Sequence, residues 1–225
     1  MRAIWAIIPI KDLSQAKQRL SSMLSGEERR ALGLAMLEDV LVALAHAKGL
    51  SGILLVSSDA KACELAARYG ARLLPDTETK GLNPAVSAAA RLLASEGVAG
   101  ALVLHGDIPM ATSDEIEALM AALPPAPAMA IAPDSAQDGT NAMLVSPPDL
   151  IPFRYGGNSF SAHLQEAAKC GVAPRVLDLP GLAFDVDTLN DLISLTAAPQ
   201  ASRAQQVLRA LHLETRLPAA STPAR

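Results

Sequence analysis

The sequence has 225 residues, which is enough for one sizeable domain and short for two. Half of the residues are apolar but only 3% are aromatic, so we expect an aliphatic core. The net charge of -4, without a cluster of Lys and Arg, argues against nucleic acid as a partner, because binding to the phosphate backbone depends on such clusters.

The chain opens with a short apolar stretch, AIWAIIPI at residues 3–10, which predicts a first buried strand. The stretch is too short to span a bilayer and no signal-cleavage pattern follows it, so we expect a soluble cytoplasmic protein without a membrane partner. Cys63 and Cys170 lie far apart without metal or redox spacing, and we expect both to be reduced. The four histidines form no triad or metal pattern and are expected to be structural.

Strands and helices then alternate along the chain. Apolar residues three or four apart between positions 26 and 49 predict a long helix, and Thr112 with Glu115 matches a capping box that starts a later helix. The other expected elements are strands over 52–59, 71–76, 101–107, 128–134, 141–148 and 173–181, and helices over 61–70, 85–97, 159–171 and from Thr188 onward.

This alternation predicts an α/β fold with a mostly parallel sheet and helices on both faces. The strands are continuous apolar runs, as expected for strands that are buried on both sides. We expect one domain over residues 1–198. Residues 199–225 are rich in Ala, Pro, Ser and Thr, and predict a loosely ordered tail with one short helix near 203–211.

In open α/β sheets, ligands bind beyond the carboxyl ends of the strands, so the residues that follow each strand are site candidates. The segment after the first strand, IPIKDLSQAKQRL, carries the cations Lys11, Lys17 and Arg19. It lacks both the Walker pattern G-x-x-x-x-G-K-[ST] and the dinucleotide pattern G-x-G-x-x-G, which disfavours those nucleotide sites. The cations suit phosphate groups, and a solvated basic turn is the alternative.

Carboxylates follow two other predicted strands. Asp107 ends the run ALVLHGD, where the sheet and Pro109 fix its backbone as suits a metal ligand; the alternative is a simple cap of the next turn. Asp185 and Asp187 are two residues apart, so in extended chain they point to one face and repel unless a cation lies between them. Asp187 has the alternative of only beginning the last helix. Carboxylates near phosphates usually hold Mg²⁺, which favours phosphoryl or nucleotidyl transfer.

Taken together, several motifs resemble one family. The stretches IPIKDLSQAKQRL, KGLNPAV, GDIP, DGTNAML, YGGNSFSAH and FDVDTLNDL are similar to those of the 2-phospho-L-lactate guanylyltransferase family, which serves biosynthesis of coenzyme F-420. The resemblance implies a Rossmann-like nucleotidyltransferase fold of the GT-A type, a three-layer αβα sandwich around a mixed, mostly parallel sheet. It also implies that a small phosphorylated carboxylic acid attacks the α-phosphorus of GTP and that pyrophosphate leaves.

The resemblance further implies roles for individual residues. The GTP phosphates would be gripped by Lys11, Lys17 and Arg19, and the guanine and ribose would be contacted by Gly81, Leu82 and Asn83. One or two Mg²⁺ ions would be held by Asp107, Asp185 and Asp187. The phosphate of the acid would be bound by Thr140, Gly156 and Ser159. The catalytic residues would be Lys11, Lys17 and Asp107.

Several alternatives stay open at this point. The acid is 3-phospho-D-glycerate, phosphoenolpyruvate or 2-phospho-L-lactate, because these differ only by small groups whose recognition depends on side-chain placement. Another nucleotidyltransferase of the same fold, of the molybdenum-cofactor or sugar-phosphate type, is one rival, and a non-catalytic nucleotide-binding protein is another. A homodimer is compatible with the sequence, and the product is expected to pass to a downstream transferase of the coenzyme pathway.

Overall fold

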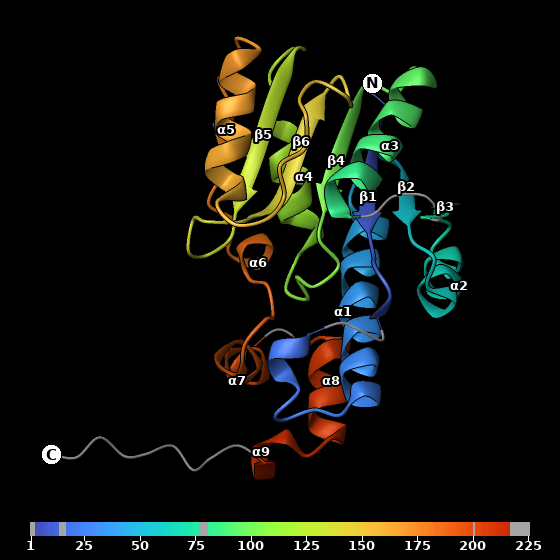
Figure 1. Cartoon of the computed structure of the whole chain (residues 1–225), viewed down its shortest axis with the longest axis vertical. Helices are drawn as coiled ribbons and strands as arrows, with labels where there is room; N and C mark the ends of the chain where they lie inside the picture. Colours follow the sequence, from blue (N-terminus) through green and yellow to red (C-terminus); the bar gives the residue numbers. More distant parts are fainter. Residues whose placement is uncertain (1–2, 14–16, 77–80, 200, 217–225) are drawn as a thin grey trace, which may run out of the picture.

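The computed structural model describes residues 3–13, 17–76, 81–199 and 201–216 (Figure 1). Within these residues seven strands form one sheet in the order β3-β2-β1-β4-β6-β5-β7. The strands are β1 (Ile4–Pro9), β2 (Leu50–Val56), β3 (Arg72–Leu74), β4 (Gly100–Leu104), β5 (Ala128–Pro133), β6 (Thr140–Ser146) and β7 (Arg175–Val176).

Helices connect and flank these strands. They are η2 (Gln18–Leu20), α1 (Gly26–His46), α2 (Ala60–Arg68), α3 (Leu82–Ser95), α4 (Ser113–Ala121), α5 (Ser159–Lys169), α6 (Pro180–Ala183), α7 (Leu189–Ala197), α8 (Arg203–Ala210) and α9 (Leu213–Arg216). The capping box predicted at Thr112 is present, as is the cap predicted at Thr188. No helix in the described part of the chain combines the length and apolarity that a membrane crossing requires.

The sheet is mixed and mostly parallel, which confirms the predicted fold class. Only β6 runs antiparallel to its neighbours β4 and β5. The β5–β6 connection is a short loop whose shape Asp134 fixes, because its carboxylate accepts the N–H groups of Asp138 and Gly139 at 2.9 and 2.8 Å. As a result the first residue of β6, Thr140, lies at the same edge of the sheet as the carboxyl ends of β1 and β4.

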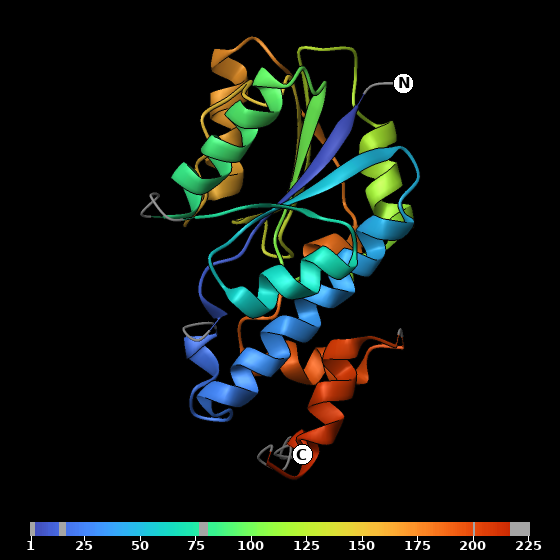
Figure 2. The same cartoon turned by 90° about the vertical axis from the view of Figure 1, so that its right-hand side faces the viewer.

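Helices cover both faces of the sheet, so the molecule has three layers (Figure 2). On one face α1, α2 and α4 pack against alternate strand residues such as Ala6 and Ile8. On the other face α3 and α5 pack against the intervening residues such as Ile7 and Val103. Each strand is therefore buried on both sides, which explains the continuous apolar runs in its sequence.

A third apolar cluster lies below the sheet and includes the chain's last described helices (Figure 1). Helix α1 extends beyond the end of the sheet, and the part that extends packs against α8 through buried Ala204 and Leu208. Asp39 of α1 accepts the N–H groups of Arg203 and Ala204 at 2.8 and 3.0 Å, which caps α8. The short helix predicted near 203–211 is thus present as α8, and it packs against α1.

Two further elements differ from their prediction. Helix α3 begins at Leu82, three residues earlier than expected, because Pro84 falls in the first turn, where a missing N–H costs no hydrogen bond. The strand predicted over 173–181 is reduced to Arg175–Val176, since α6 already begins at Pro180. The Lys80 end of the KGLN motif and the tail after Arg216 lie outside the described residues.

Candidate functional site

The predicted site residues converge on the edge of the sheet where the parallel strands end. A cavity of about 360 Å³ opens there, and Lys11, Lys17, Leu82 and Asp107 are among the residues that line it. Lys11 follows β1, Asp107 follows β4, and Leu82 begins α3. Residues from three distant stretches therefore share one hollow, as the rule for open α/β sheets predicts.

The acidic residues are brought together by a backbone hydrogen bond. The N–H of Val186 donates to the carbonyl oxygen of Asp107 at 3.1 Å, so the segment 185–187 runs alongside the end of β4. Val186 is fully buried, while Asp185 and Asp187 on either side of it are half-buried. Asp185 also accepts a hydrogen bond from the amide of Asn141 at 3.2 Å, which ties it to β6.

Lys17 lies between two of these carboxylates. Its Nζ atom is 2.6 Å from Asp107 Oδ2 and 2.7 Å from Asp187 Oδ1, and its side chain is only 8% exposed. Its backbone has a left-handed φ of 52°, a strained conformation for a lysine. The two ion pairs accompany this conformation, and strain of this kind is commonly found at functional sites.

The neighbouring charged side chains of this site shift one another's pKa. Burial acts to lower the pKa of Lys17, but the carboxylates of Asp107 and Asp187 outweigh it and the pKa is raised. Burial acts to raise the pKa of Asp107, but the Lys17 ammonium outweighs it and the pKa is lowered. The pKa of Asp185 is raised, chiefly by burial and also by the charges of Asp107 and Asp187. A cation is thus stabilised at this point and additional negative charge is not.

The carboxylates offer oxygen ligands but no finished metal cage. Among the described residues, no three His, Cys, Asp or Glu side chains are grouped closely enough to hold a metal ion. The physical reason lies in Lys17, whose ammonium takes the position between Asp107 and Asp187. Asp107 Oδ1, however, is buried and has no hydrogen-bond partner among the described residues, and such a carboxylate oxygen is a ligand that a cation could use.

The other two cations of the same segment are more exposed. Arg19 is 77% exposed and lies 3.7 Å from Asp187, so its ion pair is weak. Lys11 is exposed at the mouth of the cavity. Both side chains are therefore accessible to a ligand that approaches from solvent.

The residues predicted for guanine and ribose form the start of α3. Gly81 has a φ of +128° and precedes the helix, a conformation that favours glycine. Leu82 lines the cavity, as predicted for a nucleotide contact. The amide of Asn83 is engaged elsewhere, because it donates to the carbonyl oxygen of Tyr155 at 3.0 Å and accepts the Tyr155 N–H at 2.6 Å. Asn83 therefore joins the nucleotide side to the loop that carries Gly156.

The three residues predicted to bind the phospho-acid also lie together. Ser159 is the first residue of α5, and its N–H donates to the carbonyl oxygen of Gly156 at 3.2 Å. Thr140 contacts the same helix, since its Oγ1 lies 3.0 Å from His163 Nδ1. The helix begins after Asn158, in a left-handed conformation, so Ser159 is its first helical residue and not its cap.

Sequence reasoning did not foresee that two polar groups would meet beside this site. His105 Nε2 and the Tyr155 hydroxyl are buried and have no hydrogen-bond partner in the part of the chain that the structure describes. Their rings lie 5.1 Å apart, and the Tyr155 ring lies 4.9 Å from that of His163. The motifs YGGNSF and HGDIP contained these residues, but nothing in their spacing indicated that they would meet.

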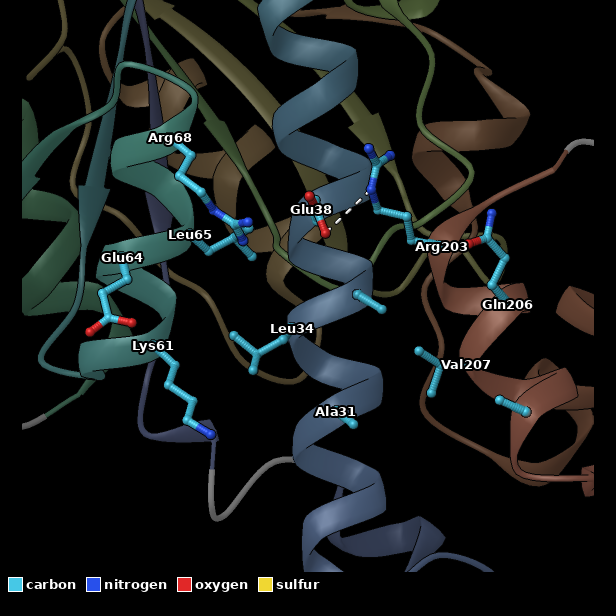
Figure 3. Close-up of a pocket in the computed structure, with 12 residues that line it drawn as sticks. Ala31, Leu34, Glu38, Lys61, Glu64, Leu65, Arg68, Arg203, Gln206 and Val207 are labelled. Atoms are coloured by element: carbon cyan, nitrogen blue, oxygen red, sulfur yellow. Dashed lines mark ion pairs between the residues drawn. The ribbon is translucent and has the colours of Figure 1, made fainter.

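A hollow larger than the cavity at this edge lies elsewhere in the described part of the chain. It measures about 930 Å³ and runs along α1 between α2 and α8 (Figure 3). Its walls carry Arg203 paired with Glu38 at 3.3 Å, with Lys61, Glu64 and Arg68 opposite. None of the predicted site residues lines it, so size alone does not locate the site here.

Comparisons with known proteins place this chain among nucleotidyl-transferring enzymes of one family. The family model described as "Guanylyl transferase CofC like" matches residues 4–224. A phosphoenolpyruvate guanylyltransferase of Rubrobacter xylanophilus is 39% identical over 87% of this chain and 95% of its own length. One of Sphaerobacter thermophilus is 41% identical over 84% and 91%, and a 3-phospho-D-glycerate guanylyltransferase of Colwellia psychrerythraea is 34% identical over 86% and 92%.

Solved structures support the fold alone. A protein described as a nucleotide-diphospho-sugar transferase from Desulfovibrio desulfuricans G20 has a TM-score of 0.72 at 15% identity, covering 96% of this chain and 99% of its own. A 4-diphosphocytidyl-2C-methyl-D-erythritol synthase has a TM-score of 0.62 at 14% identity, covering 87% and 98%. The architecture is therefore that of a single-domain nucleotidyltransferase.

Proposed function

We propose that this chain, which belongs to the family of CofC-like guanylyl transferases, joins the guanylyl group of GTP to the phosphate of a small phosphorylated carboxylic acid. A phosphate oxygen of the acid bonds to the α-phosphorus of GTP, the bond from that phosphorus to the β-phosphate breaks, and pyrophosphate leaves. The observation that most supports this chemistry is the Lys17 ammonium between Asp107 and Asp187. A reaction between two anions depends on cations that offset their charge, and this group, with two carboxylates to one ammonium, favours a further cation.

The nucleophile in this reaction needs no general base. A phosphate oxygen is already ionised near neutral pH, so no proton has to be removed before attack. His163 agrees with this, because both of its ring nitrogens are engaged within the protein. The work of the chain's own residues is to position the reactants, with Lys11, Lys17 and Arg19 neutralising the phosphates of GTP.

The donor set at this edge supports a proposal for Mg²⁺. Asp107, Asp185 and Asp187 supply the hard oxygen ligands that Mg²⁺ prefers, and Asp107 Oδ1 is buried without a partner among the described residues. A bound ion would share the carboxylates of Asp107 and Asp187 with Lys17. We propose that these three carboxylates hold one or two Mg²⁺ ions. When bound, Mg²⁺ would withdraw charge from the triphosphate and stabilise the departing pyrophosphate.

The phospho-acid would lie toward α5. Thr140 offers a hydroxyl, Gly156 an open backbone with a φ of +133°, and Ser159 the start of a helix whose dipole favours an anion. The names of the relatives make phosphoenolpyruvate and 3-phospho-D-glycerate the first candidates, and 2-phospho-L-lactate is the third. The match to this family favours these acids over the molybdenum-cofactor and sugar-phosphate alternatives.

The setting of the reaction is part of the same proposal. The guanylylated acid would enter biosynthesis of coenzyme F-420 by passing to a downstream transferase. The location would be the cytoplasm, where both GTP and the phospho-acids are available. A homodimer stays a prediction that sedimentation can decide.

Release of pyrophosphate is the assay that tests this function. The full chain is incubated with Mg²⁺, one acid at a time, and GTP, ATP or CTP. We expect release only when GTP and one of the acids are both present. Asp149→Asn is the matched control for Asp107→Asn, because Asp149 is exposed beyond the opposite edge of the sheet. Release without an acid, or with ATP alone, would contradict the proposal.

A further inference from the structure

His163 is the most deeply buried histidine near the proposed acid site. It lies on α5, it is 0% exposed, and both ring nitrogens are within hydrogen-bond distance of a partner. The backbone N–H of Arg154 lies 2.9 Å from Nε2, and Thr140 Oγ1 lies 3.0 Å from Nδ1. The side chain therefore bridges β6 and the loop that leads into α5.

These two partners fix the protonation state of the ring. A backbone N–H can only donate, so Nε2 must carry the lone pair that accepts from Arg154. Burial is the main cause that lowers the pKa of His163 to about 4. The interaction with His105 also lowers this pKa, whereas the interaction with Glu166 acts to raise it. The ring is therefore neutral at pH 7. The single ring hydrogen is then on Nδ1, which donates to the Thr140 oxygen.

The direction of this hydrogen bond decides what Thr140 can do. Because its oxygen accepts from His163, the hydroxyl hydrogen of Thr140 is left to donate to a different acceptor. An anionic phosphate is an acceptor, and a donor that is already oriented loses less entropy on binding it.

The same ring also lies next to the segment that leads to Gly156. Arg154, whose N–H lies 2.9 Å from Nε2, is two residues before Gly156, and Ser159 is one helical turn before His163 on α5. The Tyr155 ring packs against the imidazole at 71°, with the centroids 4.9 Å apart. A single side chain thus contacts Thr140 and the two residues that precede Gly156.

We infer that His163 is a positioning residue for the phospho-acid, which makes Thr140 a hydrogen-bond donor and holds the loop that carries Gly156. The inference rests on the proposed function, and it adds a residue that does not touch the substrate itself. It separates two contributions, the Nδ1–H that orients Thr140 and the Nε2 that anchors Arg154.

Substitutions can separate these two contributions. In His163→Gln the amide reaches the position of Nε2 and can accept from Arg154, but the donor to Thr140 is lost. In His163→Asn the amide nitrogen takes the position of Nδ1 and keeps that donor. We expect His163→Gln to raise the KM for the phospho-acid about five- to tenfold, as for one lost hydrogen bond, with the KM for GTP unchanged. His163→Asn should recover most of the affinity for the acid.

A double substitution tests whether His163 acts through Thr140. Thr140→Val removes the hydroxyl, so combining it with His163→Gln should raise the KM for the acid no further than Thr140→Val alone. Leu164→Ala is the matched control, since Leu164 packs against the same core from the next position of α5. It should lower stability without changing either KM.

A measurement on the unmodified protein covers the case in which these variants do not fold. With ¹⁵N-labelled histidine, the signals of His46, His105 and His212 are identified by their loss in single replacements, and the remaining signal of the unmodified protein reports His163. We expect the Nδ1–H neutral form, with a shift on adding the phospho-acid. Three results would overturn the inference. These are an Nε2–H form of the ring, additive effects of His163→Gln and Thr140→Val on the KM for the acid, or an unchanged KM for the acid in His163→Gln. If the unmodified enzyme guanylylates none of the acids, the proposed function fails, whereas the ring state still tests the bond to Thr140.

Discussion

The ammonium group of Lys17 lies 2.6 Å from a carboxylate oxygen of Asp107, although the two residues are 90 positions apart in the chain. The pair joins the segment after β1 to the end of β4, the two strands at the centre of the sheet. It places a fixed positive and a fixed negative charge at the edge where a nucleotide would enter. The first two predictions concern this pair.

Asp107→Asn should abolish most of the activity while leaving the fold intact. The amide keeps the shape of the side chain but removes the charge that Lys17 and a cation require. We expect kcat to fall about 100-fold or more, in the range seen when a main electrostatic contact is lost. Initial rates of pyrophosphate release measure this, with Asp149→Asn as the control. Activity within twofold of the unmodified enzyme would show that Asp107 is not in the site.

Lys17→Met and Arg19→Met should differ in size of effect. Lys17 is almost buried between two carboxylates, and its loss leaves them facing each other without a cation, whereas Arg19 is 77% exposed. We expect Lys17→Met to lower kcat/KM for GTP about 100-fold and Arg19→Met about tenfold or less. Steady-state kinetics at saturating acid distinguish them. The reverse order would mean that the exposed arginine carries the main contact with the phosphates.

Asn83→Ala should weaken the binding of both substrates. Its amide makes two hydrogen bonds with the Tyr155 backbone, so it supports the loop of Gly156 as well as the start of α3. We expect the KM for the acid and the KM for GTP each to rise about fivefold, as for lost hydrogen bonds. An effect on GTP alone, with weaker discrimination against ATP, would instead favour direct contact between Asn83 and guanine.

The stability of the protein should depend on pH through His163. Burial is the main cause that lowers the pKa of this imidazole from 6.5 to about 4, so the unfolded chain binds the proton more tightly than the folded one. The contribution is complete above pH 6.5 and is lost as the pH falls toward 4. Between pH 7 and pH 5, we expect the unmodified protein to lose about 2 kcal/mol of unfolding free energy more than His163→Gln does. Urea titrations at both pH values measure the difference, and equal losses would contradict it.

Leu208→Ala should destabilise the whole domain. Leu208 is 1% exposed in the cluster beneath the sheet, so its truncation leaves a cavity that costs about 2–4 kcal/mol. Gln206→Ala, on the exposed side of the same helix, should change stability by less than about 0.5 kcal/mol. Urea unfolding compares the two. Equal effects would mean that α8 is loosely attached after all.

The sequence predicted the sheet well because its strands are apolar on both faces, as in AIWAIIP and GALVL. The expected position of the site follows from topology, since parallel strands end at a common edge. What could not be predicted depends on contacts between distant residues. The packing of α8 depends on Asp39, and the engagement of Asn83 depends on Tyr155. Periodicity describes one element at a time and carries no information about such partners.

The same limit applies to Lys17 and His163. The sequence indicated that Lys17 suits phosphates, but its place between Asp107 and Asp187 depends on a backbone turn that no motif encodes. His163 was expected to be structural, and the orientation of its ring became meaningful only with Arg154 and Thr140 in place. The roles of the individual site residues stay predictions that the experiments above decide.

Mass spectrometry of the reaction product tests the central claim most directly. The purified chain is incubated with GTP, Mg²⁺ and an equal mixture of phosphoenolpyruvate, 3-phospho-D-glycerate and 2-phospho-L-lactate, with Asp107→Asn in parallel. The account predicts a new species with the mass of one acid plus a guanylyl group, formed by the unmodified protein and nearly absent with the variant. Consumption of GTP without any guanylylated acid, or equal product from both proteins, would contradict it.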